Sequence, residues 1–316
     1  MMYNSHRSVR QRFVFSARPD PRDRIKQKGL FDMIDINTRF ITLIGTPLSQ
    51  SFSARMQNKG YEAAGLNMCY FYTETGQEHL KEIIDGIRYM PSFAGCAVTK
   101  PNKVEVLKYL DELDPLCDKM QACNTVKRTE DNRLIGYNTD GIGFYKSIEE
   151  ETDFVLRDSV SYVLGAGGAG RAIASALAFQ GAGKIYISDK NEESARFLAE
   201  DINKNFAPVA VFAPFGDYSC LPECGLVINA TGIGMGSSVG RSPLPKDVIR
   251  PEMLCFDACY NPAKTQFLMD AEDQGAKILN GLGMCLYQGV AQIEIWTGKR
   301  APVEAMRQEL MDITQG

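Results

Sequence analysis

The sequence predicts an α/β protein of two domains, and three observations carry this prediction. Short apolar stretches alternate with amphipathic ones from residue 36 onward, as strands alternating with helices do. A glycine-rich turn, Gly165-Ala-Gly-Gly-Ala-Gly170, stands between an apolar run and an alanine-rich run. The length of 316 residues suits two hydrophobic cores. We therefore expect one domain in residues 36–139 together with 284–316, and a second in residues 140–283.

The first predicted domain reads as an α/β sheet. Its strands are expected at residues 36–45, 69–73, 95–99, 123–128 and 134–138, the last two as a hairpin. Its helices are expected at residues 52–65, 79–90 and 103–110, and a helix over 141–150 leads into the second domain. The C-terminal stretches 284–296 and 302–311 have helical apolar spacing, and we expect them to return to the first domain.

The second predicted domain begins with a strand over residues 159–164, the glycine turn, and a helix over 171–180 that stops at Gly181. In the turn, Gly165 permits the tight bend, Gly167 lets the backbone approach a pyrophosphate, and Gly170 lets helix and strand pack closely. The helix amides and dipole then face the phosphates. This pattern predicts a Rossmann-type dinucleotide-binding domain, with further strands at residues 184–189, 208–212, 226–229, 254–257 and 277–280.

Asp189 indicates which dinucleotide is bound. It closes the next strand, about 20 residues after the glycine turn, where a carboxylate binds the adenosine ribose of NAD. A 2′-phosphate about 4 Å from Asp189 would be repelled by about 4 kcal/mol at an effective dielectric constant near 20. Solvent and the neighbouring Lys190 reduce this penalty. We therefore expect NAD as the preferred cofactor, with NADP also accepted.

Composition excludes several other classes of protein. The net charge is −4 and the main body has no long basic stripe, so we expect neither a nucleic acid nor a membrane as partner. No apolar run approaches the length of a membrane span and no secretory signal opens the chain, which predicts a cytoplasmic protein. The sequence leaves open whether it is a monomer or a homodimer. The nine cysteines form no Cys-x-x-Cys pair and there are only two histidines, so no metal site is expected.

The first 35 residues differ from the rest of the chain. Arginines and lysines are scattered through them with few periodic apolar positions. We expect a disordered extension or a start codon assigned too far upstream.

Polar residues gather where strands of the first domain end, which is where open α/β sheets bind ligands. Ser51 and Ser53 precede a helix and can hold a carboxylate, although a helix cap explains a serine there equally well. Lys103 lies at a helix start, where the helix dipole disfavours a cation; this position favours a functional role, with a solvated surface lysine as the structural alternative. Asn124 and Asp140 add an amide and a carboxylate near the domain junction, with a helix cap as the structural alternative for Asp140.

A series of motifs gives the chain, from Phe40 to its C-terminus, a resemblance to shikimate dehydrogenases. In order, the motifs are Ile44-Gly-Thr-Pro-Leu-Ser-Gln-Ser-Phe-Ser53, Val98-Thr-Lys-Pro-Asn-Lys103, Ala122-Cys-Asn-Thr125, Asn138-Thr-Asp-Gly-Ile-Gly-Phe144, Gly165 to Arg171, Asn229-Ala-Thr231, Asp257-Ala-Cys-Tyr-Asn-Pro262 and Gly283-Met-Cys-Leu-Tyr-Gln288. The Met56-Gln-Asn-Lys59 segment, the turn at Lys103 and the acid Asp189 most resemble the quinate/shikimate dehydrogenase branch that accepts NAD. The resemblance implies reversible oxidation of shikimate to 3-dehydroshikimate, or of quinate to 3-dehydroquinate, in aromatic amino acid biosynthesis.

The resemblance also implies a role for each candidate residue. Lys103 and Asp140 would be the catalytic acid–base pair, which moves a proton as hydride passes between substrate and NAD. The substrate would be bound by Ser51 and Ser53 at its carboxylate and by Thr99, Asn124 and Gln288 at its ring hydroxyls, with Tyr260 lining the cleft. The cofactor would be bound by Gly165, Ala166, Gly167, Gly168, Ala169 and Gly170 at the pyrophosphate, Asp189 and Lys190 at the ribose, and Thr231, Ala258 and Gly281 along the nicotinamide half.

Ala97 departs from the family pattern, because an asparagine that contacts a substrate hydroxyl is common at this position. The missing amide predicts altered or broader substrate choice, such as quinate beside shikimate. Two alternatives stay open: a quinate- or shikimate-sensing regulatory protein on the same fold, and a dehydrogenase of a related cyclic hydroxy acid. The presence of both Lys103 and Asp140 favours an enzyme over a sensor.

Overall fold

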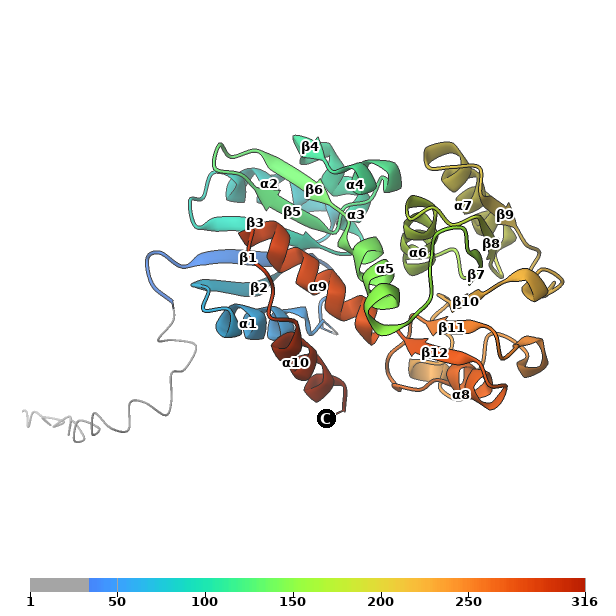
Figure 1. Cartoon of the computed structure of the whole chain (residues 1–316). Coiled ribbons are helices and arrows are strands. Elements are labelled where there is room, and N and C mark those ends of the chain that lie inside the picture. The colour runs from blue at the N-terminus through green and yellow to red at the C-terminus, as the bar shows by residue number, and fades with distance from the viewer. Residues whose placement is uncertain (1–33, 50, 316) are drawn as a thin grey trace, which may run out of the picture.

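Two six-stranded sheets, one from each half of the chain, organise the structure (Figure 1). The computed structural model describes residues 34–49 and 51–315, so nearly all of the extension expected at residues 1–35 lies outside the described residues. The first sheet lies within residues 39–137 and the second within residues 160–280. The two-domain α/β fold expected from the sequence is therefore confirmed.

The first sheet mixes parallel and antiparallel pairing. Its strands are β1 (Arg39–Gly45), β2 (Met68–Glu74), β3 (Phe93–Val98), β4 (Glu112–Leu113), β5 (Thr125–Arg128) and β6 (Leu134–Tyr137), in the order β2-β1-β3-β5-β6-β4. Strand β1 pairs in parallel with β2 and β3, whereas β5 pairs antiparallel with β3 and with β6. The predicted hairpin is confirmed as β5 and β6, and the short edge strand β4 was not expected.

Four helices and two 3₁₀ turns connect these strands. They are α1 (Ser53–Ala63), η3 (Gln77–His79), α2 (Leu80–Arg88), α3 (Asn102–Glu105), η4 (Val106–Tyr109) and α4 (Pro115–Met120). The single helix expected over residues 103–110 is divided into α3 and η4. Here the Lys103 carbonyl accepts the Cys123 amide proton at 2.8 Å, which ties the start of this segment to the loop before β5. Buried apolar clusters form the core, one around Met56 and Trp296 and another around Ile84 and Phe93.

The second sheet is entirely parallel. Its strands are β7 (Val160–Leu164), β8 (Lys184–Ser188), β9 (Ala210–Phe212), β10 (Leu226–Asn229), β11 (Leu254–Asp257) and β12 (Lys277–Asn280), in the order β12-β11-β10-β7-β8-β9. Its connections include α6 (Gly168–Phe179), α7 (Glu192–Asn205), α8 (Gln266–Asp273) and the 3₁₀ turns η5 (Leu221–Glu223), η6 (Gly236–Ser238) and η7 (Lys246–Val248). The strand order reverses between the neighbouring central strands β7 and β10. The carboxyl ends of these two strands therefore form the switch point where doubly wound sheets bind nucleotides.

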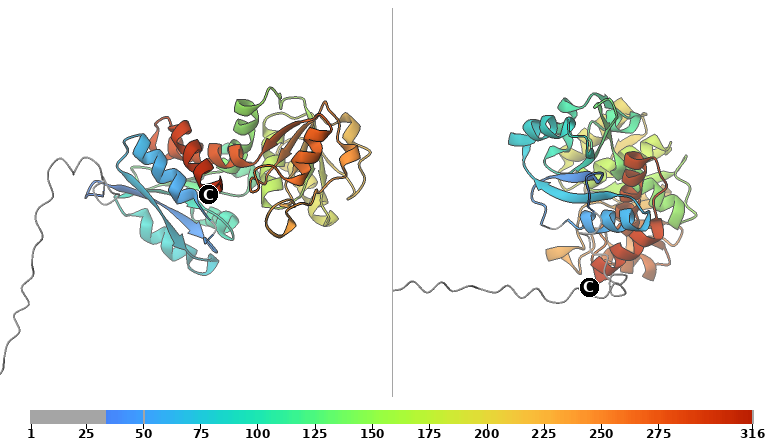
Figure 2. Two further views of the ribbon diagram at one scale, coloured as in Figure 1. Left: turned by 90° about the horizontal axis from the view of Figure 1, so that it is seen from below. Right: turned by 90° about the vertical axis from the view of Figure 1, so that its left-hand side faces the viewer.

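Two long helices link the lobes. Helix α5 (Thr139–Glu151) leads from the first sheet to the second, and α9 (Leu282–Thr297) returns from it. The two pack against each other between the lobes, and α10 (Val303–Gln315) then packs on α1 (Figures 1 and 2). The Phe144 ring meets Phe256 edge to face at 5.1 Å, which anchors α5 on the second sheet. None of the helices in the described part of the chain is long and apolar enough to cross a bilayer.

Candidate active site between the two lobes

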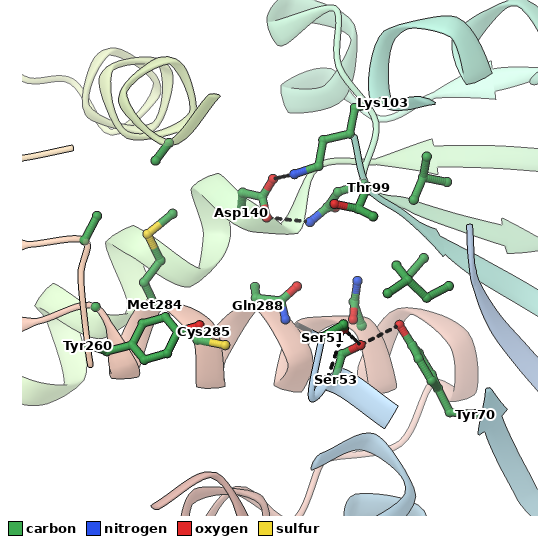
Figure 3. A pocket seen from close by; sticks show the side chains of 18 residues that line it. Ser51, Ser53, Tyr70, Thr99, Lys103, Asp140, Tyr260, Met284, Cys285 and Gln288 are labelled. Atoms are coloured by element: carbon green, nitrogen blue, oxygen red, sulfur yellow. Dashed lines mark hydrogen bonds and ion pairs between the residues drawn. The ribbon is translucent and has the colours of Figure 1, made fainter. Parts of the chain in front are cut away.

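A pocket of about 290 Å³ opens between the lobes, and the sequence-predicted substrate and catalytic residues line it together (Figure 3). These residues are Ser51, Ser53, Thr99, Lys103, Asn124, Asp140, Tyr260 and Gln288. Three residues expected at the cofactor, Ala169, Ala258 and Gly281, line the same pocket from the second lobe. The pocket thus places the polar residues expected to bind substrate next to residues expected at the nicotinamide end of the cofactor.

Lys103 and Asp140 form an ion pair at the wall of the pocket. Their Nζ and Oδ2 atoms are 2.6 Å apart, and their side chains are 34% and 23% exposed. Lys103 lies on the short helix α3, so the carboxylate of Asp140 offsets the unfavourable position of a cation at a helix start. Asp140 does not cap the helix, because Asn138 caps α5 by accepting from the amides of Asp140 and Gly141.

Asn124 orients the second oxygen of Asp140. Its Nδ2 donates to Asp140 Oδ1 at 2.9 Å, and its Oδ1 accepts the backbone amide proton of Thr139 at 2.7 Å. A backbone N–H can only donate, so this bond fixes which way the Asn124 amide points. Asp140 is therefore held at both oxygens, by an ammonium group on one side and by an oriented amide on the other.

The two serines face the pocket from the turn before α1. Their Oγ atoms are 3.0 Å apart, and Ser53 Oγ donates to Tyr70 Oη at 3.4 Å (Figure 3). Phe52 occupies the cap position of α1 and makes no side-chain cap bond, so a serine cap does not account for the pair. The Tyr72 hydroxyl donates to Ser51 O at 2.8 Å and accepts from Ala54 N at 3.2 Å, which holds the serine turn in place.

Tyr70 is a pocket residue that the sequence analysis did not single out. It lies on the edge strand β2 and is buried, and burial raises the pKa of its phenol. The side chain of Asn58 on α1 brackets its backbone, donating to Tyr70 O at 2.8 Å and accepting from Tyr70 N at 2.8 Å. Other pocket residues not foreseen are Leu43, Val98, Met284, Cys285 and Gln292, and Ala97 adds to the apolar side of the pocket.

The glycine turn has the shape of a pyrophosphate cradle. Gly165 has φ +110°, and a Cβ on it would lie 2.7 Å from the Ala230 backbone. A Cβ on Gly170 would lie 1.7 Å from Gly165 O, whereas at Gly167 and Gly168 it would meet nothing within 4 Å. Two glycines are thus required for close packing, and two leave open space at the N-terminus of α6. These residues fit a dinucleotide, because backbone amides and open space are what its phosphates need there.

A second cavity of about 320 Å³ lies beside this turn. It is lined by Gly165, Gly167, Asp189, Lys190 and Thr231 of the predicted cofactor set, together with Leu164, Phe215, Ala230, Ile233 and Pro243. Asp189 accepts the amide proton of Ala166 at 2.7 Å through Oδ2 and that of Asn191 at 2.8 Å through Oδ1. The carboxylate is therefore fixed at the end of β8. Ala166, Gly168 and Gly170 form the turn itself and line neither cavity.

A buried network supports the segment that carries Ala258 and Tyr260. Asp257 is fully buried and accepts from Asn229 Nδ2 and Cys259 N, both at 2.9 Å, and from the Thr265 hydroxyl at 2.5 Å. Its pKa is raised, because burial disfavours the charged form. The Tyr260 ring contacts Phe52 edge to face at 5.7 Å, which joins the two lobes at the pocket mouth.

Two family models match this chain, one in its N-terminal half and one near its C-terminus. The model of the shikimate dehydrogenase substrate binding domain matches residues 43–126, and that of the shikimate 5′-dehydrogenase C-terminal domain matches residues 281–311. The first match includes the serine turn, β3 and Lys103. The second includes α9 with Gln288.

Whole-chain comparisons give the same result. A shikimate dehydrogenase (NADP(+)) of Desulforamulus reducens is 39% identical over 281 residues, covering 88% of this chain and 96% of that protein. The structure of shikimate 5-dehydrogenase from Listeria monocytogenes with shikimate and NAD has TM-score 0.83 and 36% identity, covering 88% of this chain and 98% of that one. Quinate dehydrogenase from Corynebacterium glutamicum with NAD has TM-score 0.80 and 27% identity, covering 87% and 99%.

Proposed function

This chain belongs to the shikimate dehydrogenase family, and we propose that its pocket oxidises shikimate or quinate reversibly with Lys103 and Asp140 as the acid–base pair. Family membership makes the chain an NAD(P)-dependent oxidoreductase acting on a CH–OH group. The observation that carries the proposed roles is the 2.6 Å contact between Lys103 Nζ and Asp140 Oδ2 at the pocket wall. A ligand sensor on this fold would need no such proton-transfer pair.

The proposed chemistry assigns proton transfer to Lys103. In oxidation, the neutral amine accepts the proton of the substrate hydroxyl as the same carbon gives up a hydride. NAD(P), when bound, supplies the hydride acceptor. In reduction, the ammonium form of Lys103 returns the proton to the developing alkoxide oxygen. Asp140 holds the amine and the hydroxyl in one hydrogen-bonded array, while Ser51 and Ser53 bind the carboxylate and keep the ring in register.

An absorbance assay at the NAD(P)H band tests this proposal, with shikimate and quinate each paired with NAD and NADP. Lys103→Ala should lower kcat by about 10²- to 10⁴-fold and leave NADH binding unchanged. Lys100→Ala is the matched control, because Lys100 is exposed and lies outside the pocket. Near wild-type turnover in Lys103→Ala would contradict the assignment. Absence of turnover with all four pairings would favour a sensor or a different cyclic hydroxy acid.

NAD is the cofactor that Asp189 favours. Its carboxylate is fixed by two backbone amides, so it cannot easily turn away from a 2′-phosphate. The repulsion has an upper bound of about 4 kcal/mol at about 4 Å. Asp189→Ser should therefore lower the ratio of kcat/KM for NAD to that for NADP, whereas Lys190→Ser should raise it by removing a nearby cation. A wild-type enzyme with higher kcat/KM for NADP would contradict this part of the proposal, as would an unchanged ratio in Asp189→Ser.

Ala97 is proposed to broaden the substrate range toward quinate. It lies on β3, is 3% exposed, and lines the pocket without offering a hydrogen-bonding group. A site that bonds a hydroxyl discriminates strongly between substrates with and without it, so Ala97→Asn should sharpen the preference between shikimate and quinate. Ala97→Val is the control for added volume. Equal effects of the two substitutions on the ratio of kcat/KM values would attribute the change to volume and overturn the role of the amide.

A further inference from the structure

A line of buried polar side chains runs from α1 to the catalytic carboxylate. Gln57 Nε2 donates to Gln292 Oε1 at 2.9 Å, and Gln292 Nε2 donates to Thr125 Oγ1 at 2.9 Å. Thr125 Oγ1 donates to Asn124 Oδ1 at 2.8 Å, and Asn124 Nδ2 donates to Asp140 Oδ1 at 2.9 Å. Every donor in this line therefore points toward Asp140, and four elements of the fold contribute to it.

The direction of the line is set by chemistry at both ends. At the inner end, the Thr139 amide holds Asn124 Oδ1, so only the Asn124 amino group can face Asp140. The Thr125 hydroxyl accepts an N–H from Gln292, and its one proton has its shorter hydrogen bond to Asn124 Oδ1 at 2.8 Å, with Thr139 Oγ1 further away at 3.2 Å. At the outer end, Gln57 also donates to Gly289 O at 3.2 Å, which fixes its amino group toward α9.

Gln57 is the residue of this line whose burial serves no other purpose in the structure. Its side chain is fully buried, does not line the pocket, and leaves its own Oε1 without a partner among the described residues. A buried amide with an unsatisfied oxygen destabilises a protein core relative to an apolar side chain of similar size. This unfavourable burial occurs at the residue whose N–H groups hold Gln292. Gln292 in turn contacts Thr125, which bonds to the Asn124 carboxamide beside Asp140.

We propose that Gln57, acting through Gln292 and Thr125, is a positioning residue that holds Asn124 and Asp140 in the geometry needed for proton transfer. The inference rests on the proposed function for the role of Asp140 and goes beyond it in naming what orients that residue. Loss of the Gln57 donor frees Gln292 to rotate, and the Thr125 hydroxyl is then free to turn from Asn124 toward Thr139. The carboxylate keeps its ion pair, and the Thr139 amide keeps the Asn124 amino group facing it, but the Thr125 bond that also holds Asn124 in place is weakened.

Gln57→Met tests the proposal, because methionine has nearly the length of glutamine and no N–H group. We expect kcat to fall about tenfold, with KM for substrate and cofactor nearly unchanged and the acidic limb of the pH–rate profile altered. Gln57→His restores a ring N–H donor at this position and should recover most of the lost kcat. Tyr61→Phe is the matched control, because Tyr61 lies one turn further along α1, is fully buried, and has a hydroxyl without a partner among the described residues.

A second readout separates this inference from the proposed function. The side-chain amide signals of Asn124 in ¹H–¹⁵N spectra should shift in Gln57→Met and stay in place in Tyr61→Phe, whether or not shikimate is the substrate. Unmoved Asn124 signals in a folded Gln57→Met protein would overturn the inference. So would wild-type kcat and pH profile in that variant, or an equal loss of kcat in Tyr61→Phe. Absence of turnover in the wild type, with the Asn124 shift present, would refute the proposed function and leave the positioning role supported.

Discussion

Gly143 allows α5 and α9 to approach closely enough to form the pocket between the lobes, and Gly143→Ala tests this. A Cβ at this position would lie 2.3 Å from Met284 O and 2.8 Å from Gln288 N. A carbon atom approaches a carbonyl oxygen to about 3.3 Å. The two helices must therefore separate by about 1 Å to admit the methyl group. Asp140 lies one turn earlier on α5, and Gln288 lies on α9, so the separation acts on both sides of the pocket.

The expected effects of Gly143→Ala follow from that displacement. Overpacking of a buried contact lowers the free energy of unfolding by about 1–3 kcal/mol. A misplacement of about 1 Å at a reacting group lowers the rate by about 10²-fold. We expect both losses in NADH-absorbance kinetics and urea unfolding. Gly86→Ala is the control, because a Cβ there meets nothing within 4 Å and should stabilise α2 by about 0.5–1 kcal/mol. Wild-type kcat in Gly143→Ala would refute the link between helix separation and the position of Asp140.

Three further predictions concern residues of the second lobe and of α9. Gly170→Ala would bring a Cβ to 1.7 Å from Gly165 O and should abolish NADH binding in calorimetry; a wild-type Kd would contradict this. Burial raises the pKa of Asp257 above 3.8, so its contribution to stability is present at low pH and lost as pH rises through the raised pKa. The free energy of unfolding of Asp257→Asn should therefore rise relative to that of the wild type as pH rises above about 4. Urea unfolding at several pH values measures this, and a stability difference that does not change with pH would contradict it. Burial raises the pKa values of Cys255, Cys259 and Cys285 to about 12, whereas a hydrogen bond from Cys224 lowers that of Cys220. Iodoacetamide near neutral pH should label Cys220 before those three, and equal labelling in peptide mass spectrometry would show that reasoning to be wrong.

The second sheet was predicted well because its signals are local. An apolar run followed by Gly165 and an alanine-rich stretch identifies strand, turn and helix within a few residues. Helices α4, α7 and α8 were not among the expected elements, although Asp114, Asn191 and Thr265 cap them with typical start residues. The segment after Lys103 departed from its expected helix because Cys123, distant in sequence, bonds to the Lys103 carbonyl.

The site was predicted through motifs, and its supporting contacts were not. Resemblance named both members of the proposed acid–base pair and six further residues that the fold brings into the same pocket, which are Ser51, Ser53, Thr99, Asn124, Tyr260 and Gln288. Nothing local to Gln292 indicates that it reaches Thr125, 167 residues earlier in the chain. Tyr70 likewise looks like an ordinary strand residue until α1 and β2 are packed together. Contacts of this kind depend on the completed fold, so sequence periodicity does not reveal them.

The bracket that Asn58 places on Tyr70 also affects the exposed edge of the first sheet. Strand β2 ends its sheet, so its outer backbone groups are free to recruit a strand from another molecule. At Tyr70 both of those groups are already taken by one side-chain amide. An incoming strand would have to displace that amide and α1 with it. The two hydrogen bonds that hold the backbone of Tyr70 therefore also block strand pairing at this point of the sheet edge.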